Sequence, residues 1–101
     1  MSGKATVRLV TIVAEAVLVP SIVALMKETG VSGYTLVDAS GEGSRGRRTG
    51  EIPGDNVRVE TLVAPETADS LLTQLAQRWF ADYAVVAWVV DAEVVRESKY
   101  R

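Results

Sequence analysis

The segment at residues 84–95, AVVAWVVDAEVV, constrains the fold of this chain most, because it is rich in β-branched residues and apolar on both alternating sets of positions. In a strand, one side would carry Val86, Trp88 and Val90, and the other would carry Val85, Ala87 and Val89. Such a strand needs apolar cover on both faces. We therefore expect a layer of helices over one face of its sheet and a second protein surface over the other.

Three further segments have the composition of strands. Residues 6–13, TVRLVTIV, are rich in β-branched types and predict a buried strand. Residues 32–40, SGYTLVDAS, and residues 56–64, NVRVETLVA, alternate between apolar and polar positions. The alternation in the last of these predicts that Val57, Val59, Thr61 and Val63 face the core while Arg58 and Glu60 face away from it.

Two segments between these strands have helical periodicity. In the first, Val19, Ile22, Val23 and Met26 recur at the three-to-four spacing of a helix face, with Pro20 in the first turn and Gly30 as the terminating residue. The second begins at Pro65 and ends before the sequence FADY. Its apolar stripe is expected to consist of Ala68, Leu71, Leu72, Leu75, Ala76 and Trp79.

The resulting order, βαββαβ, predicts an α+β sandwich of the ferredoxin-like type: a four-stranded antiparallel sheet with two helices on one face. A chain of 101 residues is long enough for one such domain, so residues 1–101 are expected to form a single unit. Because the second sheet face is also apolar, we expect a homo-oligomer with the sheets packed inward. The alternative is a monomer with an exposed apolar sheet.

Composition excludes several kinds of chemistry. The chain has no cysteine and no histidine, which excludes disulfides, thiolate nucleophiles, imidazole bases and the usual zinc ligand sets. A net charge of -2 argues against general affinity for nucleic acid. No apolar run approaches the length of a membrane span, and the start of the chain does not resemble a signal peptide, so we expect a soluble cytoplasmic protein.

The segment GEGSRGRRTGE, residues 41–51, is a candidate anion-binding loop. It contains four glycines and three arginines and has no apolar side chain. Small residues let backbone N–H groups converge on an anion, and arginine adds charge-assisted hydrogen bonds to phosphate oxygens. The alternative is a solvated hairpin tip, because the segment is neither a P-loop nor a dinucleotide-binding GxGxxG motif.

Two stretches, GYTLVDASGEGSRGRR and FADYAVVAWVVDAEVV, resemble the PII signal-transduction superfamily, most closely the PII-like branch that includes the bicarbonate-transporter partner SbtB and carboxysome-associated regulators. The resemblance covers nearly the whole chain. It implies a homotrimer whose sheets face the threefold axis, with an adenine nucleotide in each cleft between subunits. Residues 41–55 would form the T-loop, which changes conformation with the ligand and docks on a target such as a bicarbonate transporter, and residues 96–101 would form a C-terminal tail.

The resemblance also implies roles for particular residues. Phosphate contacts are expected from Gly41, Gly43, Ser44 and Arg45, with Arg47 as a further phosphate ligand or a partner-facing charge. Gly33, Tyr34 and Thr35 would form the pocket near the base. Asp82, Tyr83, Ala84 and Val85 would provide backbone contacts from the other side of the cleft.

The chain also departs from ordinary PII proteins. Only FADYAV joins the second helix to the last strand, so the glycine-rich loop that holds polyphosphate is missing. We therefore expect AMP, ADP or cyclic AMP rather than ATP with magnesium, no other cofactor and no metal. Bicarbonate is a candidate second ligand. Trp79, Phe80 and Trp88 lie on apolar faces and are expected in the core.

Together these features predict a non-enzymatic signalling protein that regulates inorganic-carbon uptake or fixation. The alternative is a small hydrolase of phosphate esters or acyl phosphates, which would place an arginine beside a phosphate. The absence of histidine and cysteine and of a positioned carboxylate base argues against the enzyme.

Overall fold

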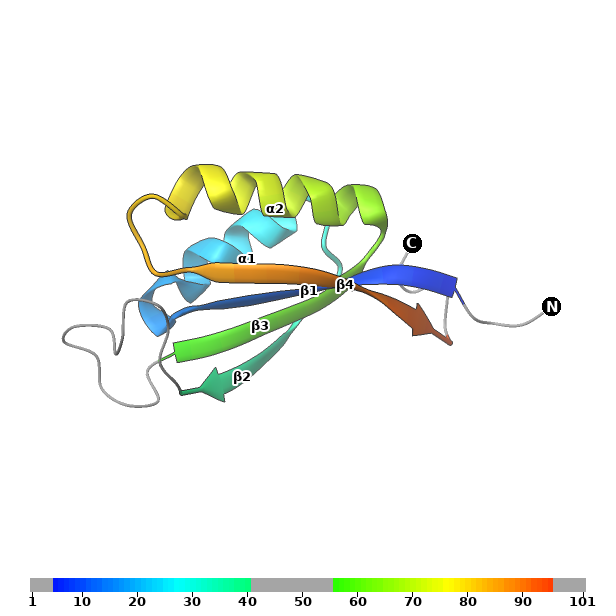
Figure 1. The fold of residues 1–101 in the computed structure, drawn as a ribbon, viewed down its shortest axis with the longest axis horizontal. Helices are drawn as coiled ribbons and strands as arrows, with labels where there is room; N and C mark the ends of the chain where they lie inside the picture. Colours follow the sequence, from blue (N-terminus) through cyan, green and yellow to red (C-terminus); the bar gives the residue numbers. More distant parts are fainter. Residues whose placement is uncertain (1–4, 41–55, 96–101) are drawn as a thin grey trace.

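The computed structural model describes residues 5–40 and 56–95, which form a helical layer over a sheet (Figure 1). The elements are β1 (Ala5–Glu15), a short 3-10 helix (Ala16–Leu18), α1 (Val19–Glu28), β2 (Thr35–Ala39), β3 (Asn56–Val63), α2 (Pro65–Trp79) and β4 (Val86–Val94). The predicted order βαββαβ is confirmed. The 3-10 turn was not predicted, and β2 is shorter than the expected segment at residues 32–40.

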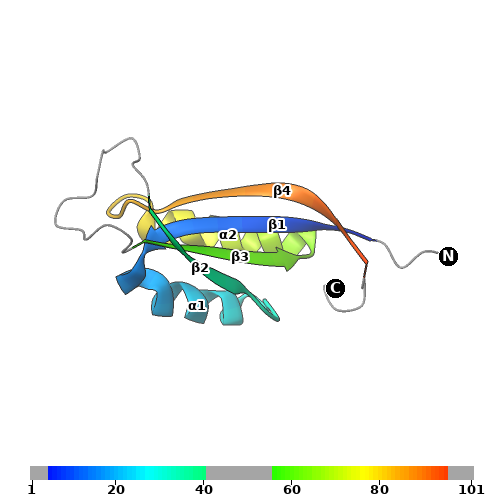
Figure 2. The same cartoon turned by 90° about the horizontal axis from the view of Figure 1, so that it is seen from below.

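The sheet has the strand order β2-β3-β1-β4, and all three neighbouring pairs are antiparallel. Both helices lie on one face, so that a view from the other side shows the strands in front (Figures 1 and 2). This is the ferredoxin-like arrangement that the sequence predicts. The two longest strands, β1 and β4, occupy a central and an edge position, and β2 forms the other edge.

The core lies between the helices and the sheet. Val10 and Ile12 of β1, Val59 of β3, and Leu71 and Leu75 of α2 are all fully buried there. The strand and helix periodicities therefore converge on one apolar layer, as expected from the sequence.

Two local features set the ends of α1. The helix begins at Val19 with Pro20 in its first turn, where the missing N–H of proline would have no partner within the helix. It is followed by Gly30 at φ 93°, where the Gly30 N–H donates to the Lys27 carbonyl at 3.2 Å and the Val31 N–H to the Met26 carbonyl at 2.9 Å. This pair of hydrogen bonds is a Schellman motif, and it needs a left-handed residue that glycine adopts without strain.

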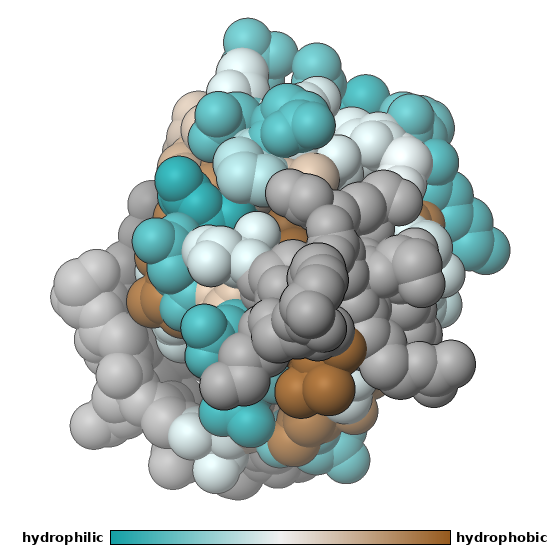
Figure 3. Space-filling view, turned by 90° about the vertical axis from the view of Figure 1, so that its right-hand side faces the viewer, coloured by the Kyte–Doolittle hydropathy of each residue, from teal (hydrophilic) through white to brown (hydrophobic). Residues whose placement is uncertain are grey.

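Large apolar side chains on the opposite sheet face remain about half-exposed among the described residues. Val86, Trp88 and Val90 of β4 are exposed to 50%, 48% and 49%, and they pair with Val13, Thr11 and Leu9 of β1. Figure 3, an end-on view, shows hydrophilic side chains over the upper, helical layer and a hydrophobic cluster on the lower, sheet side. The prediction of one apolar face beyond the reach of the helices is confirmed.

Three core expectations were wrong for this protomer. Trp88 lies on the face opposite the helices, and Phe80 lies just after the end of α2, so both are exposed. Ala76 is exposed as well, because the buried stripe of α2 passes through Ala68, Leu71 and Leu75. Trp79 does pack against the core.

Candidate functional site

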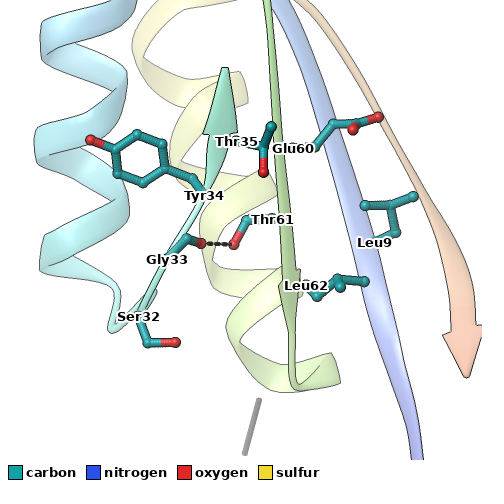
Figure 4. Close-up of a pocket in the computed structure, with 8 residues that line it drawn as sticks. All are labelled: Leu9, Ser32, Gly33, Tyr34, Thr35, Glu60, Thr61 and Leu62. Atoms are coloured by element: carbon teal, nitrogen blue, oxygen red, sulfur yellow. Dashed lines mark hydrogen bonds between the residues drawn. The ribbon is translucent and has the colours of Figure 1, made fainter. Parts of the chain in front are cut away.

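A pocket of about 330 Å³ lies where β2 begins, on the edge of the open sheet face (Figure 4). Its lining comes from β1, from β3 and from the segment that leads into β2. The lining residues are Leu9, Ser32, Gly33, Tyr34, Thr35, Glu60, Thr61 and Leu62. A volume of this size is at the lower end of the range for ligand sites, which suits part of a larger ligand.

The strand register determines which side chains line this pocket from the open face of the sheet. Thr35 pairs with Glu60, and Leu62 pairs with Leu9, so these four side chains share the open face. They combine two apolar side chains with one hydroxyl and one carboxylate. The Glu60 carboxylate also lies 3.6 Å from Nε of Arg58, on the same face of β3.

A buried hydroxyl connects two walls of the pocket. Thr61 is only 3% exposed, and its Oγ1 donates a hydrogen bond of 2.6 Å to the carbonyl oxygen of Gly33, which Figure 4 marks with a dashed line. The β2–β3 ladder ends at the pair Thr35 and Glu60, so this bond lies beyond the last pair of the ladder. It explains how a segment outside the strand remains against β3.

Gly33 leaves space at the rim of the pocket. A Cβ atom added there would meet no protein atom within 4 Å, and the residue does not have a positive φ. The backbone of this position therefore tolerates a side chain.

The three residues predicted to lie near a base, Gly33, Tyr34 and Thr35, are brought together in this pocket. Their side chains differ in direction. The ring of Tyr34 is directed towards α1, away from the other labelled side chains, and it is 41% exposed (Figure 4).

The second predicted group, Asp82 to Val85, lies in the connection between α2 and β4. The N–H groups of Asp82 and Tyr83 donate to the Trp79 carbonyl at 3.3 and 2.9 Å, which closes a tight turn after the helix. Tyr83 is exposed, Ala84 is half-buried and Val85 is buried. These two backbone N–H groups are thus already used within the chain.

The predicted groups lie far apart in one protomer. Asp82 to Val85 precede β4 at the end of the sheet where Ala39 pairs with Asn56, whereas the pocket lies at the start of β2. A strand advances about 3.3 Å per residue, so Thr35 and Ser40 are separated by about 16 Å. The predicted phosphate ligands Gly41, Gly43, Ser44, Arg45 and Arg47 follow Ser40 and lie outside the described residues.

Five lining residues were not predicted as site residues: Leu9, Ser32, Glu60, Thr61 and Leu62. Four of them belong to β1 and β3, and they reach the pocket only through the strand pairing. The available signal was the carboxylate of Glu60 on a face that is otherwise largely apolar, which sequence analysis treated as a solvent-facing charge.

The described ranges, 5–40 and 56–95, contain neither a metal-ligand cluster nor a helix that could span a membrane. In these ranges no group of three acidic side chains is arranged to hold a metal ion. Neither helix there has the length and apolar character needed to cross a bilayer.

Comparison with known proteins gives one family and close structural neighbours. The family model described as Nitrogen regulatory protein P-II matches residues 7–99. A PII-like protein from Thermus thermophilus is 44% identical, with 100% of each chain covered and a TM-score of 0.85.

A second neighbour is CPII from Thiomonas intermedia, solved with ADP and bicarbonate bound. It is 28% identical, with 97% of each chain covered and a TM-score of 0.86. Another structure of CPII, with ADP, AMP and bicarbonate, is 27% identical, covers 97% of this chain and 96% of that chain, and has a TM-score of 0.84.

Proposed function

The chain belongs to the P-II family, and on that premise we propose that it is a non-enzymatic regulator that binds an adenine nucleotide, AMP, ADP or cyclic AMP. The observation that carries the proposal is the pocket at the start of β2, which includes Gly33, Tyr34 and Thr35. The relative CPII binds ADP, and in one structure ADP and AMP, which supports the same ligand class here.

The chemistry of the pocket suits a purine base. Leu9 and Leu62 offer apolar surface to the faces of a planar ring. The carboxylate of Glu60 accepts hydrogen bonds from an exocyclic amine, and the hydroxyl of Thr35 both donates and accepts. A base therefore finds both cover and directional polar partners in this pocket.

A complete nucleotide site needs a second copy of the chain. The pocket and Ser40 lie about 16 Å apart along β2, a longer reach than the base and phosphates of one mononucleotide. We propose that the base lies in the pocket of one protomer while Gly41, Gly43, Ser44, Arg45 and Arg47 of a neighbouring copy hold the phosphates. Asp82 to Val85 would line the cleft on that neighbour.

The open sheet face supplies a reason for such assembly. Burial of a large apolar side chain is worth about 1.5 to 3 kcal/mol, and Val86, Trp88 and Val90 are each half-exposed in the single protomer. We propose a homotrimer in which these side chains face inward. The pocket opens on the same face, so neighbours that cover the face would also approach the pocket.

Bicarbonate is proposed as a second ligand because CPII was solved with it. We propose that nucleotide and bicarbonate together change the conformation of residues 41–55, and that this loop regulates a partner in inorganic-carbon uptake or fixation. A pull-down with and without ADP and bicarbonate tests the partner. Capture that does not change with either ligand would contradict the regulatory role.

Calorimetry tests the nucleotide site. AMP, ADP, ATP and cyclic AMP are titrated into wild type and into Arg45→Ala, with GDP as a control for the base. We expect saturable binding of an adenine nucleotide that Arg45→Ala weakens about tenfold or more, as loss of one charged hydrogen bond should.

Three results would count against the proposal. Absence of adenine nucleotide binding would overturn the ligand class, and equal affinity for GDP would overturn the assignment of the pocket to adenine. Multiple-turnover conversion of the nucleotide to product would favour the alternative hydrolase.

A further inference from the structure

We propose that Thr61 is a positioning residue for the pocket: its buried hydroxyl holds the Gly33 carbonyl, and thereby residues 32–35, in the shape that receives the ligand. This inference rests on the proposed function, since the ligand is the proposed adenine nucleotide. Thr61 acts through Gly33 and its neighbours rather than through contact with the base.

The position of Thr61 makes a hydroxyl unexpected. It points to the helix-covered side of β3 between Val59 and Val63, which are 0% and 5% exposed, and it pairs with the fully buried Val10. A valine would fill the same volume in this core. A hydroxyl buried among apolar side chains is unfavourable unless it is hydrogen-bonded, so the hydrogen bond that it makes is important.

That partner is remote in sequence and lies at the rim of the pocket. The bond from Thr61 Oγ1 to the Gly33 carbonyl is 2.6 Å long and joins residues 28 positions apart. Both residues line the pocket. The bond follows the last pair of the β2–β3 ladder, so it extends the connection between β3 and the chain past the end of β2.

Gly33 makes this connection more important. Glycine has the widest conformational freedom of all residues, and no side chain of its own packs against the protein here. A hydrogen bond to its carbonyl limits that freedom without filling the pocket. Pre-organisation of this kind raises affinity by reducing the entropy lost on binding.

The test compares variants at position 61. Thr61→Val removes the hydroxyl and keeps the β-branched shape, Thr61→Ala is a second variant without a hydroxyl, and Thr61→Ser keeps the hydroxyl. Ile22→Val, a mild truncation on the buried side of α1, controls for general loss of stability. Each is titrated with ADP by calorimetry, and amide hydrogen exchange is measured in the nucleotide-free protein.

Thr61→Val and Thr61→Ala are expected to weaken ADP binding about tenfold, the effect of one hydrogen bond left unmade, while Thr61→Ser and Ile22→Val stay near wild type. In the nucleotide-free protein, both hydroxyl-free variants are expected to speed amide exchange at residues 33–35. If Thr61→Val binds like wild type, or if Thr61→Ser loses as much affinity as Thr61→Val, the inference is wrong.

Failure of the proposed function gives a different result. If wild type binds no adenine nucleotide, the ligand assignment falls, and the exchange rates alone decide whether Thr61 holds the rim. Unchanged exchange at residues 33–35 in Thr61→Val would then overturn the positioning role.

Discussion

The two faces of the sheet are built from similar residues and differ in what covers them. On one face Val10, Ile12 and Val59 are fully buried under α1 and α2. On the other, Val86, Trp88 and Val90 remain about half-exposed, and the candidate pocket opens beside them. Hydrophobicity alone therefore does not distinguish a residue that folds the protomer from one that we propose joins protomers.

The difference is one of connectivity. The helix-covered face is completed by segments of the same chain, so its burial contributes to folding of the protomer. We propose that the open face is completed by another copy of the chain, so that its burial would depend on concentration and add to stability through association. Substitutions on the helix-covered face should therefore lower the unfolding free energy, and substitutions on the open face should change the mass of the assembly.

Leu71→Ala should have the largest effect on stability. Leu71 is fully buried on the face of α2 that meets the sheet, and truncation of such a leucine typically costs about 2 to 5 kcal/mol of unfolding free energy. Denaturant unfolding measures the loss. Leu72→Ala is the matched control, because Leu72 is only partly buried and its truncation should cost clearly less. Equal losses at the two positions would contradict the assignment of the core.

Trp88→Glu should have the largest effect on assembly. Placing a charge between Val86 and Val90 on the open face should prevent burial of these side chains, since an unpaired buried charge is strongly unfavourable. By sedimentation, wild type is expected to have the mass of three copies and the variant the mass of one. Trp88→Phe should retain the assembly because it keeps an apolar ring.

The control for this experiment is Gln77→Glu, which adds a charge on the exposed surface of α2 and should leave the mass unchanged. A Trp88→Glu protein with the mass of wild type would show that the open face is not the interface. A wild-type protein with the mass of one chain would contradict the proposal that the open face joins protomers.

Much of the fold follows from sequence periodicity. Alternation in β3, the apolar stripe of α2 apart from the exposed Ala76, and the terminating role of Gly30 are local patterns, and they were confirmed. The extent of β2 was not predictable in this way. Its pairing with β3 stops at Thr35. The Gly33 carbonyl instead accepts a hydrogen bond from the hydroxyl of Thr61, a contact between residues distant in sequence.

The site was predictable only in part, for the same reason. Gly33 and Thr35 were identified through a family resemblance, and they do line the pocket. Leu9 and Glu60 come from other strands, and a local pattern does not show that they meet, because their place in the pocket is set by the register of β1, β3 and β2. A register shift of one residue would move every one of these side chains to the other face.

Substitutions at Gly30 and Gly33 should affect stability and ligand binding separately, because Gly30 ends α1 and Gly33 lines the pocket. Gly30→Ala places a Cβ at φ 93°, a strained conformation that typically costs about 1 to 3 kcal/mol, so unfolding free energy should fall while ADP affinity is retained. At Gly33 an added Cβ has no described neighbour within 4 Å beyond the adjacent residues, so Gly33→Ala should leave stability unchanged or slightly raised, and we expect the added methyl to weaken ADP binding. The reverse pattern would contradict the assignment of both positions.

The smallest effects should come from two exposed ion pairs, one on each side of the sheet. Glu28 Oε1 lies 3.4 Å from Nη2 of Arg78 between the helices, and Glu60 Oε2 lies 3.6 Å from Nε of Arg58 on the open face. Exposed pairs of this kind contribute about 0 to 1 kcal/mol, so Glu28→Gln and Glu60→Gln should both change the unfolding free energy only slightly.

The effects of Glu28→Gln and Glu60→Gln on ligand binding should differ, because only Glu60 lines the pocket. Glu60→Gln replaces a charged acceptor by a neutral one and should lower ADP affinity several-fold by calorimetry, whereas Glu28→Gln should leave it unchanged. If the two variants bind ADP equally, the carboxylate of the open face has no more to do with the ligand than the carboxylate of the helical layer.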